Sequence, residues 1–408
     1  MTFDELLNLV SSDNAPRLRL DSRLVKAGDV FVAIKGTALD GHNFIDQAIA
    51  NGAKFIVCQR NTRYAIRKPV LSEAKGRVEG TQYELVVVDN SAKAAALLAQ
   101  AAAGNPASQL TNLAVTGTNG KTTVAFLVRS VIRNAGQNCG LIGTIIYDTG
   151  ASQSEAALTT PDCLAIAETQ SQMVRAGARY MVIEASSHAL AQDRLAAISF
   201  KAAAFTNLAG DHLDYHKTQA SYLTAKTKLF QELSPDATAV LNKDSSAAVK
   251  IARKTKAKIL WFAVDEPADI NAHIESMDIT GTVFTLETRA AGHESRGTVR
   301  TPLLGRYNVS NHLAAAGLCL AAGLDLQTIA AGLSALKTIP GRLEKIDWDA
   351  DFPVFIDYAH TDDALKNVLA TLKPFCKNKL IVVFGCGETE TKPKDRVWPG
   401  PPNNGPIL

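Results

Sequence analysis

The sequence predicts an α/β protein built around a mainly parallel sheet that is covered by helices. Short apolar stretches of strand length alternate with longer stretches of helical periodicity, which is the pattern of repeated βαβ units. Hydrophobic residues make up 46% of the 408 residues and charged residues 20%, as in ordinary soluble globular proteins. A chain of this length exceeds a single core, so we expect two or three domains.

Composition and charge exclude several classes of protein. Lys plus Arg number 43 against 40 Asp plus Glu, and a net charge of +3 gives no reason to expect a nucleic-acid partner. The N-terminus lacks the basic segment of a signal peptide, and no apolar run reaches the length of a membrane span. The six cysteines are scattered without metal-ligand spacing, which indicates reduced thiols. We therefore expect a cytoplasmic protein without membrane contact.

The first segment, residues 1–90, predicts a small α/β domain. Apolar strands are expected at residues 29–34, 54–58 and 83–88, and a helix at residues 44–53. The second segment, residues 91–336, continues the alternation over a longer stretch and predicts a larger central domain. Its first expected elements are a strand at 112–116, a helix at 122–136, a strand at 139–147, a helix at 161–177 and a strand at 179–185.

The third segment, residues 337–408, contains only one further βαβ unit. Strands are expected at residues 352–360 and 379–387, with a helix at 363–375 between them. This segment has 72 residues, fewer than the ~100 of a usual domain, and residues 388–408 have no apolar periodicity. The sequence therefore predicts an incomplete Rossmann-like third domain with a disordered end.

The stretch "AVTGTNGKTTVAF", residues 114–126, predicts a phosphate-binding loop. A strand is expected to end before the loop and a helix to begin after it, so backbone N–H groups and the helix N-terminus can hold phosphate oxygens. A lysine adds positive charge, and a threonine hydroxyl can ligate Mg²⁺. Val115 stands where the usual loop has its first glycine, which leaves an ordinary βα turn as the alternative. The residues expected to bind ATP are Gly117, Thr118, Asn119, Gly120, Lys121, Thr122 and Thr123.

Polar residues follow the next expected strands. Glu184 lies in "IEASSHALAQDR" and His212 in "FTNLAGDHLDYH". Because ligands bind at the carboxyl ends of strands in doubly wound sheets, both side chains could complete Mg²⁺ coordination beside the phosphates. Lys226 follows on a predicted helix, where its position alone would indicate a solvated face.

Several strings occur in an order that resembles the Mur ligase family, whose members build the stem peptide of peptidoglycan. They are "TGTNGKTT", "EASSHALAQDR", "FTNLAGDHLDYH", "GRYNVSNHLAAAG", "IPGRLE" and "DYAHTDDAL". The stretches "LDSRLVKAGDVFVAIKG" and "DGHNFIDQAIANGA" are similar to the N-terminal domain of the MurE type within this family. The resemblance covers residues 20–387 and implies three domains, which bind UDP, bind ATP and close over the site.

The resemblance implies roles for matching residues. Lys121, Lys226 and His212 are expected to be catalytic, with Lys226 carbamylated so that it helps to hold a second Mg²⁺. The expected metal set is Thr122, Glu184, His212 and the Lys226 carbamate. Further nucleotide contacts are expected from Asn308, Asn311, Arg342, Asp357 and His360. Contacts to the UDP-muramoyl-dipeptide are expected from Ser22, Arg23, Thr159, Thr160, Ser186, Gln192 and Arg194.

The implied reaction is ATP-dependent amide ligation through an acyl phosphate. The substrates would be UDP-MurNAc-L-Ala-D-Glu and an amino acid, either meso-diaminopimelate or L-lysine, and the protein is expected to be a monomer. Another Mur ligase or a folylpolyglutamate synthetase remains an alternative, although the N-terminal strings argue against both. A non-catalytic nucleotide and UDP-sugar binder is an alternative of a different class.

The last residues suggest a change of reading frame. With one base restored near Gly387, synonymous codons for residues 387–408 permit "GGDRDKTKRPRMARAAEQRADF", which resembles the family pattern at this point. We hypothesise a single-base deletion in the gene or in its sequencing, which resequencing of the locus tests. On this hypothesis the chain is expected to bind its substrates but to ligate them slowly.

Overall fold

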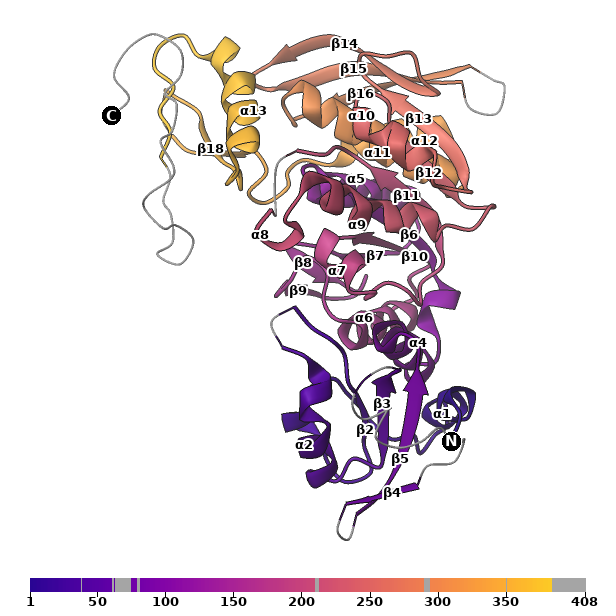
Figure 1. The fold of residues 1–408 in the computed structure, drawn as a ribbon. Helices are drawn as coiled ribbons and strands as arrows, with labels where there is room; N and C mark the ends of the chain where they lie inside the picture. Colours follow the sequence, from indigo (N-terminus) through magenta and orange to yellow (C-terminus); the bar gives the residue numbers. More distant parts are fainter. Residues whose placement is uncertain are drawn as a thin grey trace. The chain divides into compact units, whose positions relative to one another are not determined.

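The structure is a computed structural model that describes residues 1–37, 39–60, 62, 75–78, 81–209, 213–289, 294–349 and 351–383. The chain divides into two compact units, Met1–Tyr358 and Ala359–Leu408 (Figure 1). The first unit holds three sheets, within residues 18–88, 111–301 and 344–356. The domain boundaries expected near residues 90 and 336 stay predictions.

A five-stranded sheet with the order β1-β2-β3-β5-β4 occupies the first residues of the chain. Four strands are parallel, and β4 pairs antiparallel with β5. Helices α1 and α4 contribute to the apolar core on one face, and α2 contributes to the core on the other. The strands are β1 Leu18–Arg19, β2 Val30–Val32, β3 Phe55–Gln59, β4 Lys75–Val78 and β5 Thr81–Val88, and the helices are α1 Phe3–Val10, η1 Ser22–Leu24, η2 Gly41–Phe44, α2 Ile45–Ala50 and α4 Ser91–Ala102.

An eleven-stranded sheet follows, with the order β16-β15-β14-β13-β12-β11-β6-β10-β7-β8-β9. Its centre is parallel from β7 to β14, as the alternation of strands and helices predicted. Both edges are antiparallel. The strands are β6 Thr111–Thr116, β7 Cys139–Ile142, β8 Ile146–Asp148, β9 Gln153–Glu155, β10 Tyr180–Glu184, β11 Phe200–Phe205, β12 Thr238–Asn242, β13 Lys258–Ala263, β14 Ile270–Asp278, β15 Gly281–Thr288 and β16 Ser295–Thr301.

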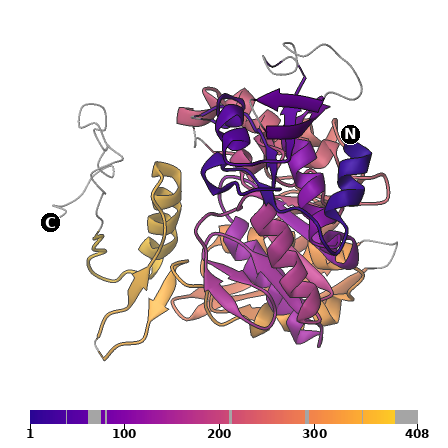
Figure 2. The same ribbon diagram turned by 90° about the horizontal axis from the view of Figure 1, so that it is seen from below.

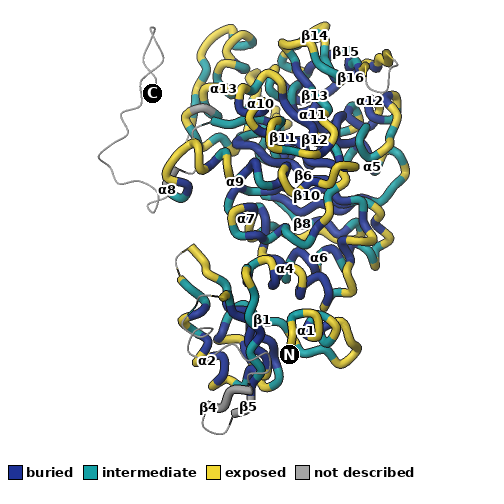
Figure 3. The backbone as a smooth tube through the Cα atoms, turned by 45° about the vertical axis from the view of Figure 1, so that its right-hand side comes forward, coloured by how far each residue is buried: buried dark blue, intermediate teal, exposed yellow. Residues whose placement is uncertain are grey.

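Helices cover both faces of this sheet because its central strands are apolar on both sides. Leu113 and Val115 of β6 join the core formed with α5, α11 and α12, whereas Ala114 joins the core formed with α6, α9 and α10. The central strands are accordingly buried along most of their lengths (Figure 3). The helices of this region are η3 Pro106–Gln109, α5 Lys121–Asn134, α6 Cys163–Arg175, α7 Ser187–Ala191, α8 Leu213–His216, α9 Gln219–Gln231, α10 Ser246–Ala252, α11 Arg306–Ala321 and α12 Leu326–Ala335.

Three expectations about strands were wrong. Residues 139–147 do not form one strand, because the chain turns at Gly143 and β8 returns antiparallel to β7. In the third segment, β18 (Val354–Ile356) pairs antiparallel with β17 (Glu344–Ile346), as paired arrows in Figure 2 show, so it is not the start of a parallel βαβ unit. Residues 379–383 form no strand, and residues 384–408, with the proposed frame change, lie outside the described residues.

The second unit contains the helix that was expected at residues 363–375. It is observed as α13, Asp362–Leu372, followed by η5, Lys373–Phe375. The Thr361 side chain caps α13 by accepting a hydrogen bond from the Ala364 N–H at 3.2 Å. Within the described part of the chain, no helix combines the length and the apolar composition that crossing a membrane requires.

Candidate active site

The loop between β6 and α5 has the backbone shape of an anion-binding turn. Gly117 and Gly120 adopt φ values of +151° and +90°, which side-chain-bearing residues rarely adopt. The loop is tied down from the end of β11, since Thr206 Oγ1 donates to the Asn119 carbonyl at 2.6 Å and the Asn119 N–H donates to Asn207 Oδ1 at 3.0 Å. The loop is thus held in place by the neighbouring strand end.

Both glycines are also required by space. A Cβ atom at Gly117 would lie 1.9 Å from Thr206 Oγ1, and one at Gly120 would lie 2.2 Å from Asn311 Oδ1. Asn311 belongs to α11, and its amide donates to Asn308 Oδ1 at 3.1 Å. The structure therefore places the expected residues Asn308 and Asn311 beside the phosphate loop.

Two lysine ammonium groups are bonded to the loop's carbonyls. Lys121 Nζ donates to Gly117 O at 3.0 Å and to Thr118 O at 2.8 Å. Lys226 Nζ donates to Gly117 O at 2.8 Å and lies 4.3 Å from the centre of the Tyr222 ring, a cation–π contact. Lys226 is 1% exposed, so its assignment to a solvated face from position alone was wrong. The reason is that this side of α9 packs against the loop and the sheet.

Thr122 and Glu184 form the group that best fits a magnesium ion. Thr122 Oγ1 donates to Glu184 Oε2 at 2.9 Å, and Glu184 is fully buried at the end of β10. Mg²⁺ usually takes one or two protein oxygens and completes its shell with water and phosphate oxygens, which suits a hydroxyl beside one carboxylate. Within the described residues, no cluster of three or more His, Cys, Asp or Glu side chains forms a ready-made metal site. His212 lies outside the described residues.

The residues expected to contact the dipeptide gather where β10 ends. Thr160 Oγ1 donates to the Glu184 carbonyl at 2.6 Å and accepts from the Ser186 N–H at 3.1 Å. Arg194 donates to the Thr160 carbonyl at 2.6 Å and to Gln192 Oε1 at 2.8 Å. The structure thus joins these residues into one hydrogen-bonded group at the carboxyl end of β10, where Glu184 also lies. Thr159 joins the same group, because its hydroxyl lies 3.1 Å from that of Thr144, which bonds the Glu184 carboxylate.

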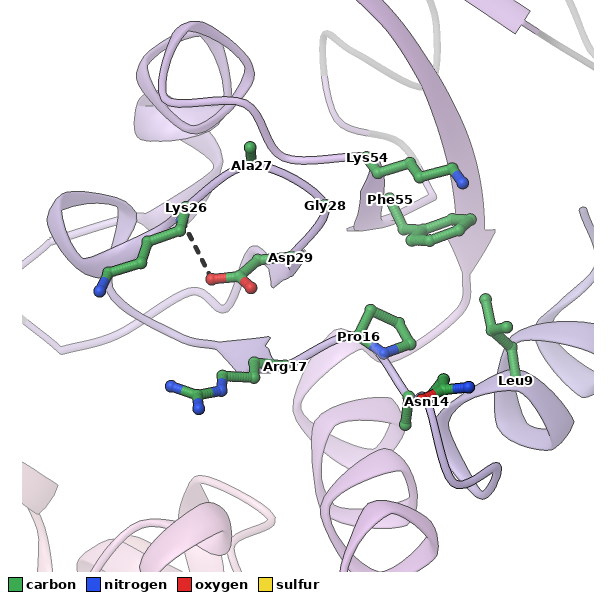
Figure 4. A pocket seen from close by; sticks show the side chains of 11 residues that line it. Leu9, Asn14, Pro16, Arg17, Lys26, Ala27, Gly28, Asp29, Lys54 and Phe55 are labelled. Atoms are coloured by element: carbon green, nitrogen blue, oxygen red, sulfur yellow. Dashed lines mark hydrogen bonds between the residues drawn. The ribbon is translucent and has the colours of Figure 1, made fainter.

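The expected uridine residues lie in the N-terminal sheet region. Ser22 is buried and its hydroxyl donates to Gln47 Oε1 at 2.7 Å, while the exposed Arg23 pairs with Asp21 at 2.6 Å. An open pocket of about 460 Å³ in the same region is lined by residues such as Arg17 and Lys54, which precede strands β1 and β3 (Figure 4). Neither Ser22 nor Arg23 is among the described residues that line it.

Residues after α12 approach the loop through Arg342. Its guanidinium donates to Thr122 Oγ1 at 3.1 Å and lies 4.9 Å from the centre of the Tyr358 ring. Asp357 Oδ2 accepts from the Leu343 N–H at 2.6 Å, and this bond supports the left-handed backbone of Leu343 at φ +47°. His360 belongs to the second unit, Ala359–Leu408. Thr123 is buried in the first turn of α5.

Sequence reasoning missed three residues that shape the site. Thr144 bonds the Glu184 carboxylate, Tyr222 lies under Lys226, and Asn207 holds the phosphate loop. The position of Asn207, directly after strand β11, is a signal that could have identified it, since strand ends meet at this edge. No local pattern indicates that Tyr222 would be buried or that Thr144 would reach Glu184.

Comparisons with known proteins agree with this geometry. The profile described as "Mur ligase middle domain" matches residues 115–319, which is half of the chain. The profiles "Mur ligase family, catalytic domain" and "Mur ligase, glutamate ligase domain" match residues 17–103 and 341–396. This chain belongs to the Mur ligase family. The resemblance inferred from the sequence strings is therefore confirmed, and the phosphate loop lies at the start of the Mur ligase middle domain.

Curated Mur ligases provide similar sequences over most of the chain. A Geobacillus kaustophilus protein named UDP-N-acetylmuramoyl-L-alanyl-D-glutamate--2,6-diaminopimelate ligase is 39% identical over 376 residues, which cover 91% of this chain and 73% of the relative. A Clostridium botulinum protein of the same name is 35% identical, with 93% and 75% covered. A solved structure of a ligase with this name has a TM-score of 0.70 and 29% identity, and the match covers 96% of this chain and 78% of that one.

Proposed function

We propose that this protein is an ATP-dependent ligase of the MurE type, which joins 2,6-diaminopimelate to UDP-N-acetylmuramoyl-L-alanyl-D-glutamate. The observation that carries the proposal is the position of Glu184. Its carboxylate bonds Thr122 of the phosphate loop, and its carbonyl bonds Thr160 of the group expected to contact the dipeptide. A phosphate donor and a carboxylate acceptor could therefore meet at one strand end. Relatives with 35–39% identity carry the name of this ligase.

The loop residues would position and neutralise the phosphates. Lys121 brings a positive charge to the Gly117 carbonyl, and loop N–H groups lie before the N-terminus of α5. Such groups are worth most where negative charge develops during phosphoryl transfer. The acceptor carboxylate oxygen would attack the γ-phosphorus, and the bond from that phosphorus to ADP would break. Arg342, bonded to Thr122 in the first turn of α5, would add a positive charge beside the same phosphates.

Thr122 and Glu184 would hold a Mg²⁺ ion, which neutralises phosphate charge when it is bound. Lys226 would serve as a carbamate in the ligase, with a new N–C bond to CO₂ and loss of a proton from its amine. The buried position of Lys226 and its bond to the loop support a role at the phosphates rather than on the surface. Mass spectrometry does not preserve carbamates well, so ¹³C NMR after incubation with ¹³C-bicarbonate is the suitable measurement.

The second half of the reaction would use the acyl phosphate. The neutral amine of the amino acid would attack the acyl carbon, the bond from carbon to the phosphate oxygen would break so that inorganic phosphate leaves, and the nitrogen would give up one proton and keep the other as the amide N–H. Thr159, Thr160, Ser186, Gln192 and Arg194 would hold the dipeptide so that its terminal carboxylate faces the loop. Arg194 suits an anionic substrate, because its guanidinium is already oriented by two neighbouring oxygens.

Phosphate release by the 408-residue chain tests the function. We expect release from ATP to require both UDP-MurNAc-L-Ala-D-Glu and an amino acid, with 2,6-diaminopimelate preferred over L-lysine, and a tripeptide product in mass spectra. Binding of ATP and of the UDP-dipeptide is measured separately by calorimetry. The expectation that this chain binds both but ligates slowly predicts normal binding with low turnover. Phosphate release from ATP that does not depend on the UDP-dipeptide would contradict the proposal. The matched control is Lys121→Ala, which should release phosphate far more slowly.

A further inference from the structure

We propose that Thr144 is a positioning residue that holds the Glu184 carboxylate in the orientation needed to ligate the cation of the bound nucleotide. This inference rests on the proposed function and names a residue that the family strings did not single out. The Thr144 N–H donates to Glu184 Oε1 at 2.8 Å, and its hydroxyl donates to Oε2 at 3.0 Å. One residue therefore binds both oxygens of the carboxylate.

The position of Thr144 follows from the sheet. Strands β7 and β10 are parallel neighbours with Ile142 opposite Ile183, so the turn after β7 lies beside Glu184. Gly143 makes the approach possible, because a Cβ atom there would lie 2.2 Å from Glu184 Oε1. Gly143 has no left-handed backbone, so the glycine is required by the space that the carboxylate occupies.

A second hydroxyl, that of Thr159, donates to Thr144. Thr159 Oγ1 lies 3.1 Å from Thr144 Oγ1. Because the Thr144 hydroxyl proton is donated to Glu184, the Thr159 hydroxyl must be the donor in this pair. Thr144 thus connects a residue expected to contact the dipeptide with the residue expected to contact the cation.

Thr122 cannot fulfil the same role throughout the reaction. Its hydroxyl donates to Glu184 Oε2 and accepts from Arg342. Thr122 is itself an expected ligand of the cation and must offer it a lone pair, whereas Thr144 is not among the expected ligands and can keep its two bonds to Glu184. Thr144 would therefore hold Glu184 both before and after the cation binds. Groups that orient a ligand in this way typically affect metal affinity by roughly 10–100-fold.

The test compares Thr144→Val, which has the same size without the hydroxyl, with Thr144→Ser, which keeps the hydroxyl. Mn²⁺ binding in the presence of ADP is followed by EPR, and ADP binding without metal by calorimetry. We expect Thr144→Val to weaken Mn²⁺ binding by about tenfold, while Thr144→Ser stays within about twofold of the unmodified chain. Metal-free ADP affinity should not change, because a residue that acts through Glu184 does not contact the nucleotide.

A double-mutant cycle separates positioning from a general structural effect. On a Glu184→Gln background, Thr144→Val should cause little further loss of Mn²⁺ affinity. Equal Mn²⁺ binding by Thr144→Val and the unmodified chain would overturn the inference, as would an undiminished loss on the Glu184→Gln background. If Thr144→Val fails to fold, failure of Thr144→Ser to retain Mn²⁺ affinity would overturn it. Absence of Mn²⁺ binding by the unmodified chain would overturn the proposed cation site itself, a result distinct from these.

Discussion

Two glycine turns follow strands β6 and β7, which flank β10, and both lie near the Glu184 carboxylate at the end of β10. The two turns need glycine for different physical reasons. In the turn after β6, Gly117 and Gly120 have left-handed backbones and lie against other side chains. In the turn after β7, Gly143 has no left-handed backbone and is required only by its distance to Glu184. The first turn therefore needs glycine for its backbone conformation as well as for space, whereas the second needs it for the space of a partner about 40 residues later.

The comparison predicts that chemistry depends most on the first turn. Replacing Lys121 by Ala removes an ammonium group from the loop and should lower kcat by roughly 10²–10³-fold, as for other groups that stabilise developing charge. Phosphate release measured at saturating substrates checks this. Lys201→Ala, at the exposed position of the otherwise mostly buried strand β11, is the matched control and should leave kcat unchanged. An unaffected kcat in Lys121→Ala would place phosphoryl transfer away from the loop.

The stability of the protein should also depend on pH through α11, the helix whose Asn311 lies against Gly120 of the first turn. His312 of α11 is fully buried, and burial lowers its pKa to about 4 from the usual 6.5. The unfolded chain therefore binds a proton that the folded chain excludes, so stability is complete above pH 6.5 and is lost as the pH falls from 6.5 to 4, by about 3 kcal/mol. Urea unfolding across this range measures the loss.

The contribution of His312 can be isolated with His312→Leu, which has a similar size and does not titrate. Its free energy of unfolding should depend less on pH between 6.5 and 4 than that of the unmodified chain. Identical pH profiles for the two chains would assign the acid sensitivity to other groups.

The two glycines can be compared directly. Gly120→Ala should lower the free energy of unfolding by about 1–3 kcal/mol, because alanine is strained at φ +90° and its Cβ meets Asn311. The ATP affinity should fall as well, since the loop must move. Thermal unfolding and calorimetry measure the two effects. Gly104→Ala, which also has a left-handed backbone but open space around it, is the control that separates backbone strain from steric conflict.

Gly143→Ala should have the smallest effect on stability. Alanine is not strained at this backbone conformation, and the new methyl group meets the end of a side chain rather than the backbone, so we expect a loss of about 1 kcal/mol. The Mn²⁺ affinity should fall nevertheless, because the carboxylate is displaced. A loss of stability as large as that of Gly120→Ala, measured in the same urea titration, would show that the two turns do not differ in the way described.

Local patterns were sufficient for much of this architecture. Strand β6, helix α5 and the phosphate loop were predicted together, because a strand, a glycine turn, a Lys-Thr pair and a helix form one contiguous signal. The break at Gly143 was not predicted, since the apolar residues on both sides read as one strand and only the hairpin with β8 interrupts it. Lys226 was placed on a solvated face for a similar reason, because its burial depends on the phosphate loop, which lies 109 residues away in the sequence.

The sequence by itself determined the mainly parallel sheet, the glycine loop before the Lys-Thr pair and the membership of the Mur ligase family, since each is read from short local strings of residues. Only the tertiary structure decided which polar groups meet. Glu184 receives hydrogen bonds from Thr122 and Thr144, which lie 62 and 40 residues before it. Parallel strands bring their carboxyl ends to one edge, so contacts there are set by strand order and register, which short patterns do not specify.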